Sequence, residues 1–210
     1  MIKRGLDILL SLSCLVMLLP VFFISGLFIR IESKGPIIFK QTRTGKGGKH
    51  FTLYKLRTMV TDIARSDIYT TPTDDPRITK SGQFLRKYNL DELTQFVNVL
   101  KGDMSIVGPR PEIPQYTELY TEEERIILSV RPGITDLATL WIQDKGSLVL
   151  GSDDPEKIYL ETIRPEKIRL QLEYVKRKST LLDIKIMLLT FKTHLLDKLV
   201  KPKSGKGKNK

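Results

Sequence analysis

Residues 8–29 read ILLSLSCLVMLLPVFFISGLFI, a run of 22 residues without a charged side chain. About 20 apolar residues are enough for a helix to cross the roughly 30 Å hydrocarbon core of a membrane. A cleaved signal peptide has a shorter apolar core and a small-residue cleavage site, whereas here Arg30 follows the run directly. A core helix of a soluble domain is a second alternative, but this run is apolar on every face and begins just after Lys3 and Arg4. We therefore predict that the run enters a membrane.

The way in which the run inserts depends on Pro20 and on the flanking charges. Pro20 removes a backbone hydrogen bond in the middle of the run and tends to kink a helix. Basic residues flank both ends of the run, and such flanks stay in the cytoplasm. A straight span cannot satisfy both ends. We expect a helix broken at Pro20 that enters and leaves through the cytoplasmic face, with a kinked helix that crosses the membrane as the alternative.

The net positive charge of the whole chain is also concentrated towards its ends. The 210 residues carry a net charge of +11, and the excess lies at the two ends. Residues 1–59 hold ten basic and two acidic side chains, residues 201–210 hold five Lys and no acid, and the remainder has a net charge of −2. A nucleic-acid-binding domain spreads its basic residues over the folded surface, so we expect no nucleic-acid partner. We expect the basic ends to lie against anionic lipid, with 201–210 as a disordered tail.

The body of the chain indicates a helix-rich α+β fold. Residues 37–59 predict a β-hairpin, in which strand alternation places Lys55 and Arg57 on one face, either as a phosphate clamp or as ordinary solvated residues. Apolar spacing predicts helices within 81–102, 121–130 and 165–199, some of them lying at the membrane interface. We expect a membrane helix over 1–34, a cytoplasmic domain over 35–200 and the tail over 201–210.

Few residue clusters could carry chemistry. Zinc is excluded, because the two His residues lie far apart in sequence and the single Cys14 lies in the apolar run. The strongest candidate is the pair Asp91-Glu92. In one interpretation Asn89 and Glu92 form a capping box at the start of a helix. In the other, the two carboxylates have different roles, one of them binding Mg²⁺ together with substrate phosphates, while Arg86, Arg110 and Arg131 supply positive charge.

The run 81–111, SGQFLRKYNLDELTQFVNVLKGDMSIVGPRP, followed by RPGIT at 131–135, resembles the bacterial sugar transferase family, the monotopic phosphoglycosyl transferases. The resemblance extends to KRGLD near the N-terminus, to the Pro-interrupted apolar run, to the hairpin and to YVKRKSTLLDIKIMLLT at 174–190. It covers nearly the whole chain in order.

The resemblance implies a reaction and a site. Members of this family transfer a sugar-1-phosphate from a UDP-sugar to polyprenyl phosphate at the cytoplasmic face of the cell membrane and release UMP. Asp91 matches the nucleophile and Mg²⁺ ligand, which forms a phosphosugar-aspartate intermediate, and Glu92 matches its acidic partner. Arg86 and Arg110 match positions that bind phosphate or organise the active site. Further phosphate-binding candidates are Lys55, Arg57 and Arg131. Structural roles are expected for Pro20, Pro109 and Pro111.

The expected partners are a UDP-sugar, a polyprenyl phosphate and membrane lipid, and a homodimer is left open. Three positions depart from the family pattern: Thr94 stands for Pro, Asp136 for Gly after RPGIT, and Gln171 for Asp ahead of Tyr174. These departures concern donor identity more than the reaction. Two other classes are weighed against the transferase: a glycosyltransferase that releases UDP, and a non-enzymatic membrane scaffold that would tolerate loss of Asp91.

Overall fold

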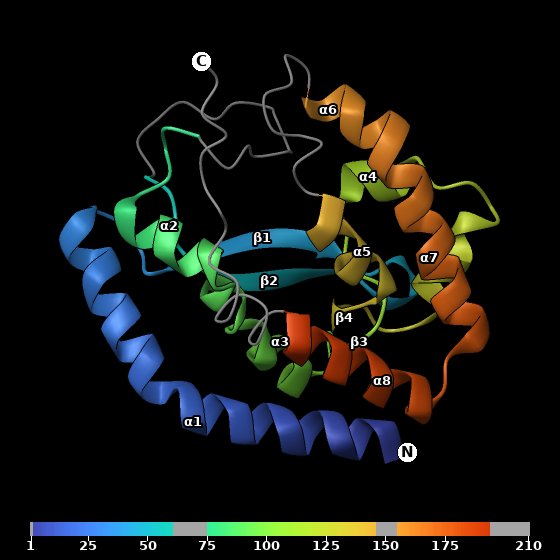
Figure 1. Ribbon diagram of the computed structural model, residues 1–210, viewed down its shortest axis with the longest axis horizontal. Coiled ribbons are helices and arrows are strands. Elements are labelled where there is room, and N and C mark those ends of the chain that lie inside the picture. Colours follow the sequence, from blue (N-terminus) through green and yellow to red (C-terminus); the bar gives the residue numbers. More distant parts are fainter. Residues whose placement is uncertain (1, 61–74, 146–154, 194–210) are drawn as a thin grey trace, which may run out of the picture.

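The computed structural model describes residues 2–60, 75–145 and 155–193 (Figure 1). It confirms a helix-rich α+β fold with a long N-terminal helix and a small β-hairpin. The helices and strands are α1 Ile2–Glu32, β1 Ile38–Thr44, β2 His50–Leu56, α2 Lys80–Lys87, α3 Gln95–Lys101, β3 Ser105–Val107, α4 Pro114–Glu118, β4 Gly133–Thr135, α5 Leu137–Lys145, α6 Pro155–Ile158, α7 Arg164–Arg177 and α8 Thr180–Phe191. Short 3₁₀ segments lie at η1 Lys46–Gly48, η2 Leu90–Glu92 and η3 Glu124–Ser129, and a short π-helix, η5, lies at Tyr159–Ile163.

Helix α1 is long and apolar enough to enter a membrane. Its most apolar 18-residue window has a mean hydropathy of 2.6, and only 11% of that window is buried. Exposed side chains include Met17 at 73% and Phe23 at 77%. The helix is continuous through Pro20, and Figure 1 shows it as two arms at an angle. Pro20 therefore lies inside a bent helix, and the expected break at this residue is not confirmed.

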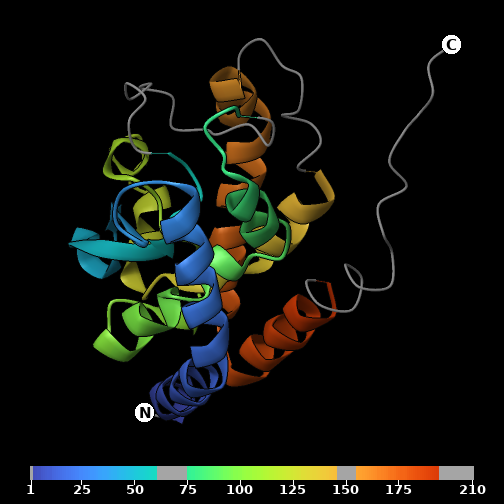
Figure 2. The ribbon, with the colours of Figure 1, turned by 90° about the vertical axis from the view of Figure 1, so that its left-hand side faces the viewer.

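Both ends of α1 are attached to the same folded body. Near the N-terminus, Lys3 donates to the carbonyl of Val107 at 2.9 Å and pairs with Asp183 of α8, and Figure 2 shows these two helices meeting at one end of the molecule. At the other end, the Glu32 carboxylate accepts from the backbone N–H groups of Lys80 and Ser81, at 2.6 and 2.8 Å. The apolar middle of the helix thus lies between two polar attachments on one body.

The predicted hairpin is confirmed. Strands β1 and β2 pair antiparallel from Ile38 opposite Leu56 to Thr44 opposite His50. Its base packs against α1 and α2 through a buried cluster of Ile29, Leu56 and Leu85.

A second sheet was not predicted from the sequence. Residues 105–107 and 133–135 lie outside the predicted hairpin and helices, and they form the parallel pair β3–β4. The two backbones touch at Gly108 and Gly133: a Cβ on Gly133 would lie 2.1 Å from the nitrogen of Gly108. Glycine is required at this crossing because no side chain fits between the chains.

The prediction that a helix starts at Asn89 was also wrong. Asn89 is left-handed, with φ 55°, and its side chain caps no helix. It ends α2, the chain then makes the single turn η2, and α3 begins at Gln95. The end of α3 is as predicted, with Gly102 at φ 92°.

The C-terminal helices are confirmed, whereas 124–129 is 3₁₀ rather than α-helical. Helices α7 and α8 pack on the second sheet through Tyr174, Val175, Ile186 and Val107. The predicted tail, 201–210, lies outside the described residues.

Candidate active site

The pair Asp91-Glu92 lies in η2, between α2 and α3 and beside the end of β2. Asp91 is buried, with 8% of its surface exposed. The two neighbouring carboxylates have different surroundings, because Lys55 and Arg110 form ion pairs with Glu92 only. The capping-box interpretation does not hold, because Asn89 makes no capping bond and the Glu92 carboxylate binds two cations instead.

Glu92 is the paired member. Its Oε1 accepts a hydrogen bond from Lys55 Nζ at 2.8 Å and also forms an ion pair with Arg110. Burial alone would raise the pKa of Glu92, but the positive charges of Arg110 and Lys55 outweigh burial and hold that pKa well below its usual range. Glu92 is therefore a fixed anion that holds two cations in place.

Asp91 is the carboxylate whose charge is poorly compensated. Burial, and next the neighbouring charge of Glu92, raise the pKa of Asp91, while Lys55 and Arg86 partly offset this rise. A carboxylate with costly ionisation beside fixed cations is typical of a functional site. Two adjacent acids thus have opposite pKa shifts.

Arg86 precedes the acidic pair in the sequence and Arg110 follows it. Arg86, on α2, donates from Nε to Thr58 Oγ1 at 2.8 Å. Burial lowers the pKa of Arg86, and Asp91 is the largest influence that raises it, so the two groups interact. Arg110 lies in the loop after β3 and binds Glu92 directly.

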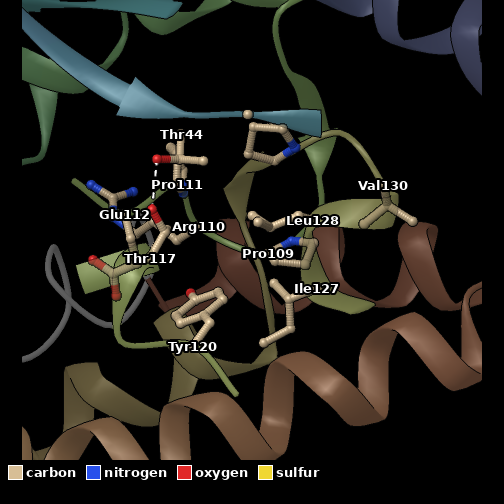
Figure 3. Close-up of a pocket in the computed structure, with 12 residues that line it drawn as sticks. Thr44, Pro109, Arg110, Pro111, Glu112, Thr117, Tyr120, Ile127, Leu128 and Val130 are labelled. Atoms are coloured by element: carbon tan, nitrogen blue, oxygen red, sulfur yellow. Dashed lines mark hydrogen bonds between the residues drawn. The ribbon is translucent and has the colours of Figure 1, made fainter. Parts of the chain in front are cut away.

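The loop that carries Arg110 is firmly supported. Pro109 accepts a backbone hydrogen bond from Gly133 at 3.0 Å, and the carbonyl of Pro111 accepts from Arg43 Nη1 at 3.1 Å. Figure 3 shows this loop over Tyr120 and Ile127. The cavity behind it has a volume of about 10 Å³, the size of a single water probe, so this side of the loop is close-packed.

The structure brings together five predicted site residues: Lys55, Arg86, Asp91, Glu92 and Arg110. It places Arg57 and Arg131 elsewhere. Arg57 is 3% exposed and donates to the carbonyls of Ile29, Ser33 and Lys34 at the C-terminal end of α1. Because β2 ends at Leu56, strand alternation no longer aligns Arg57 with Lys55.

Arg131 lies at the far end of α3 from the acidic pair. Its Nε donates to the carbonyl of Gly102 at 2.9 Å, beyond the last residue of that helix. Asp91 precedes the helix, and seven helical residues span about 10 Å.

Three supporting residues were missed by sequence reasoning. Thr58 holds Arg86, Arg43 holds the loop at Pro111, and Asp136 binds the backbone N–H of Arg110 at 3.0 Å. Only Asp136 gave a signal in the sequence, as a departure from the family pattern. The other two act through contacts between elements that sequence spacing does not show.

The site suits one divalent cation bound together with a phosphate. Among the residues that the structure describes, no three His, Cys, Asp or Glu side chains are grouped as a complete metal cage. Mg²⁺ commonly takes one or two carboxylates and completes its shell with substrate phosphates and water. The buried Asp91 carboxylate, with its raised pKa, fits that role.

A desolvated carboxylate, an ion-paired neighbour and converging cations beside an apolar helix are features typical of a phosphate-handling site at a membrane. The chain belongs to the bacterial sugar transferase family, whose profile matches residues 1–197. It is 40% identical over 194 residues to a UDP-glucose:undecaprenyl-phosphate glucose-1-phosphate transferase of Escherichia coli K12, covering 90% of this chain and 39% of that protein.

Two other relatives show the range of the similarity. A UDP-N-acetylgalactosamine-undecaprenyl-phosphate N-acetylgalactosaminephosphotransferase of Aeromonas hydrophila is 35% identical over 197 residues, covering 92% of this chain and 44% of that protein. The exopolysaccharide production protein PSS of Rhizobium leguminosarum is 38% identical over 206 residues, covering 92% of this chain and 95% of that protein. The chain thus spans less than half of two relatives and nearly all of the third.

Proposed function

We propose that this chain transfers a sugar-1-phosphate from a UDP-sugar to undecaprenyl phosphate and releases UMP, as the first step of a bacterial glycoconjugate. The observation that carries the proposal is the contrast between the desolvated Asp91 and the ion-paired Glu92 within a ring of Lys55, Arg86 and Arg110. The names of the relatives, which specify UDP-sugars and undecaprenyl phosphate, support it.

The chemistry assigned to Asp91 is nucleophilic. An Asp91 carboxylate oxygen attacks the β-phosphorus of the donor, the bond from that phosphorus to the bridging oxygen breaks, and UMP leaves with the electron pair. An oxygen of the acceptor phosphate then attacks the same phosphorus and releases Asp91. Lys55, Arg86 and Arg110 offset the charge of the phosphates, without which a carboxylate is a poor nucleophile towards them.

Mg²⁺ is the proposed cofactor, held by Asp91 together with donor phosphates, where it would neutralise phosphate charge. Glu92 keeps its own charge and fixes Lys55 and Arg110 at the edge of the site. The order of events fits one site that receives a water-soluble donor and a lipid acceptor in turn.

The membrane insertion that we propose is re-entrant. Lys3 at one end of α1 and Glu32 at the other bind the same folded body, which a helix with ends on opposite membrane faces could not do. The exposed apolar middle of α1 would then dip into one leaflet, with the body on the cytoplasmic face. Exposed apolar residues on α8, such as Leu181 and Leu188, extend this surface.

Labelling from each side of the membrane tests this topology. In a Cys14→Ser background, Ile2→Cys is expected to react with a membrane-impermeant thiol reagent only from the cytoplasmic side. Reaction from the outside in intact cells would reject re-entry. Lys178→Cys, next to α8, is the matched control for the cytoplasmic body.

An apolar cavity beside the acidic pair is the proposed seat of the acceptor's isoprenoid chain. It measures about 420 Å³ and is lined by α1, by the base of the hairpin and by Thr94 and Val97. Thr94 lies three residues after Asp91, and its hydroxyl donates to the carbonyl of Tyr54 at 2.8 Å. The cavity opens beside Val16 and Leu19, which are both 61% exposed on the apolar face of α1.

Filling this cavity is expected to impair the acceptor step alone. Val97→Trp should raise the KM for undecaprenyl phosphate by about tenfold or more, since each lost methylene contact costs about 0.8 kcal/mol. The burst of UMP that the enzyme releases without acceptor should be unchanged. Val97→Ala, which enlarges the cavity, is the control, and an unchanged acceptor KM in Val97→Trp would place the chain elsewhere.

The function itself is tested with purified protein, Mg²⁺, undecaprenyl phosphate and a panel of UDP-sugars. We expect UMP release with at least one donor, and release of UDP instead would indicate a glycosyltransferase. If no donor yields UMP or UDP, the result would favour a non-enzymatic membrane scaffold.

A further inference from the structure

Two of the departures from the family pattern, Asp136 and Gln171, lie in contact behind Arg110. Both are fully buried, with 0% exposure, although they lie 35 residues apart in sequence. Gln171 Nε2 donates to Asp136 Oδ2 at 3.0 Å. In this contact the carboxylate is at position 136 and the amide is at position 171, on α7.

The Asp136 carboxylate divides its two oxygens between two tasks. Oδ1 accepts from the backbone N–H of Thr139 at 2.6 Å, the bond of a residue that caps the start of α5. Oδ2 accepts from the backbone N–H of Arg110 at 3.0 Å, in addition to the bond from Gln171. Helix capping accounts for the first oxygen and leaves the second unexplained.

The second oxygen fixes the residue whose side chain reaches the acidic pair. With its N–H bound to Asp136, Arg110 donates from Nη1 to the carbonyl of Ile134 at 3.1 Å and from Nη2 to Glu92. Gln171 also approaches the Arg110 carbonyl, at 3.4 Å. The backbone of Arg110 is thus held on both sides of its Cα.

We propose that Asp136 and Gln171 are a pair of positioning residues that hold Arg110 against Glu92, and that one carboxylate is needed in the pair at either position. This rests on the proposed function for its effect on catalysis, since Arg110 is the phosphate-facing group. Two carboxylates would place like charges together in a fully buried contact, and none would leave the Arg110 N–H without an acceptor.

The variants separate positioning from helix capping. Asp136→Asn keeps an oxygen for the Thr139 N–H, but its amide group brings a donor towards the donors of Arg110 and Gln171. Asp136→Gly removes the carboxylate, Gln171→Asp adds a second one, and the double variant Asp136→Gly/Gln171→Asp restores a single carboxylate on α7. Asp183→Asn is the control, because Asp183 is also buried but binds Lys3 and Tyr174.

The first measurement needs no substrate. In ¹⁵N-arginine spectra of the detergent-solubilised full chain, the Arg110 Nε–H peak is identified by its loss in Arg110→Lys. We expect this peak to shift in Asp136→Asn, and the exchange of the Arg110 backbone N–H with water to speed up by about tenfold, as for the loss of its charge-assisted hydrogen bond to Asp136. The peak should return towards its wild-type position in the double variant and stay unchanged in Asp183→Asn.

The second measurement is the rate of UMP release. Asp136→Asn, Asp136→Gly and Gln171→Asp should each lower kcat by about ten- to a hundredfold, and the double variant should recover most of this loss. The melting temperature of the double variant should stay close to that of Asp136→Gly. An unmoved Arg110 peak in Asp136→Asn, or a double variant no better than Asp136→Gly in both measurements, would overturn the proposal. A wild type that releases no UMP would reject the proposed function, whereas the spectra would still decide the positioning.

Discussion

Asp91→Asn is expected to lower UMP release by about a thousandfold or more, the size of effect seen when a covalent nucleophile is removed. The same change should raise the melting temperature. Asn has nearly the shape of Asp, so it removes the carboxylate charge without creating a cavity. Loss of function would thus accompany a gain in stability, as is common where a site carries a costly charge.

The pH dependence of that gain follows from the raised pKa of Asp91. Because the folded state raises this pKa above its unfolded value, ionisation of Asp91 opposes folding. The cost is absent below the ordinary Asp pKa of about 3.9, grows as the pH rises through the folded pKa, and is complete above it. The melting temperature of the variant should therefore equal that of the wild type in acid and exceed it at neutral pH.

Thermal unfolding at about pH 3.5 and about pH 7.5, without Mg²⁺ or donor, measures this difference. Glu166→Gln is the control, because Glu166 forms an exposed ion pair with Arg169 on α7. An Asp91→Asn variant that is active, or that melts below the wild type at neutral pH, would contradict the roles given to Asp91.

Glu92→Gln is expected to have the opposite effect on stability. It removes the charge that Lys55 and Arg110 share and leaves two partly buried cations without their anion. The cost lies between those of exposed and fully buried ion pairs, about 2 kcal/mol, which lowers the melting temperature of a chain of this size by about 4–8 °C. UMP release should fall by about ten- to a hundredfold, since Arg110 loses its position.

The sign of the pH effect is also reversed. The folded state lowers the pKa of Glu92, so its stabilising effect is complete above the unfolded Glu pKa of about 4.3 and is lost as the pH falls through the folded value. The difference from wild type should stay constant between about pH 7 and pH 5 and shrink in stronger acid. Equal melting temperatures of Glu92→Gln and wild type at pH 7 would show that the ion pairs contribute nothing.

The sequence predicted those features that depend on composition and regular spacing. The uncharged run at 8–29, the hairpin at 38–56 and the helices at 164–191 each have a periodicity or a composition that needs no distant partner. Asp91 and Glu92 could also be predicted from the sequence, because they lie in a motif that resembles the sugar transferase family.

What failed depended on distant contacts. Strands β3 and β4 have three residues each, too few to show alternation, and exist because residues 105–107 and 133–135 meet. Asn89 looked like a helix start, yet it follows the end of α2 with a left-handed backbone, while the Glu92 carboxylate pairs with Lys55 and Arg110.

An apolar helix with charged ends, an acidic pair and several conspicuous cations can all be recognised in the sequence alone. The fold selects the cations that lie at the acidic pair: Arg57 closes the end of α1 and Arg131 the end of α3, while Lys55, Arg86 and Arg110 converge on Asp91 and Glu92. A charge acts over a few ångströms of space, and spacing along the chain does not fix that distance once the backbone turns.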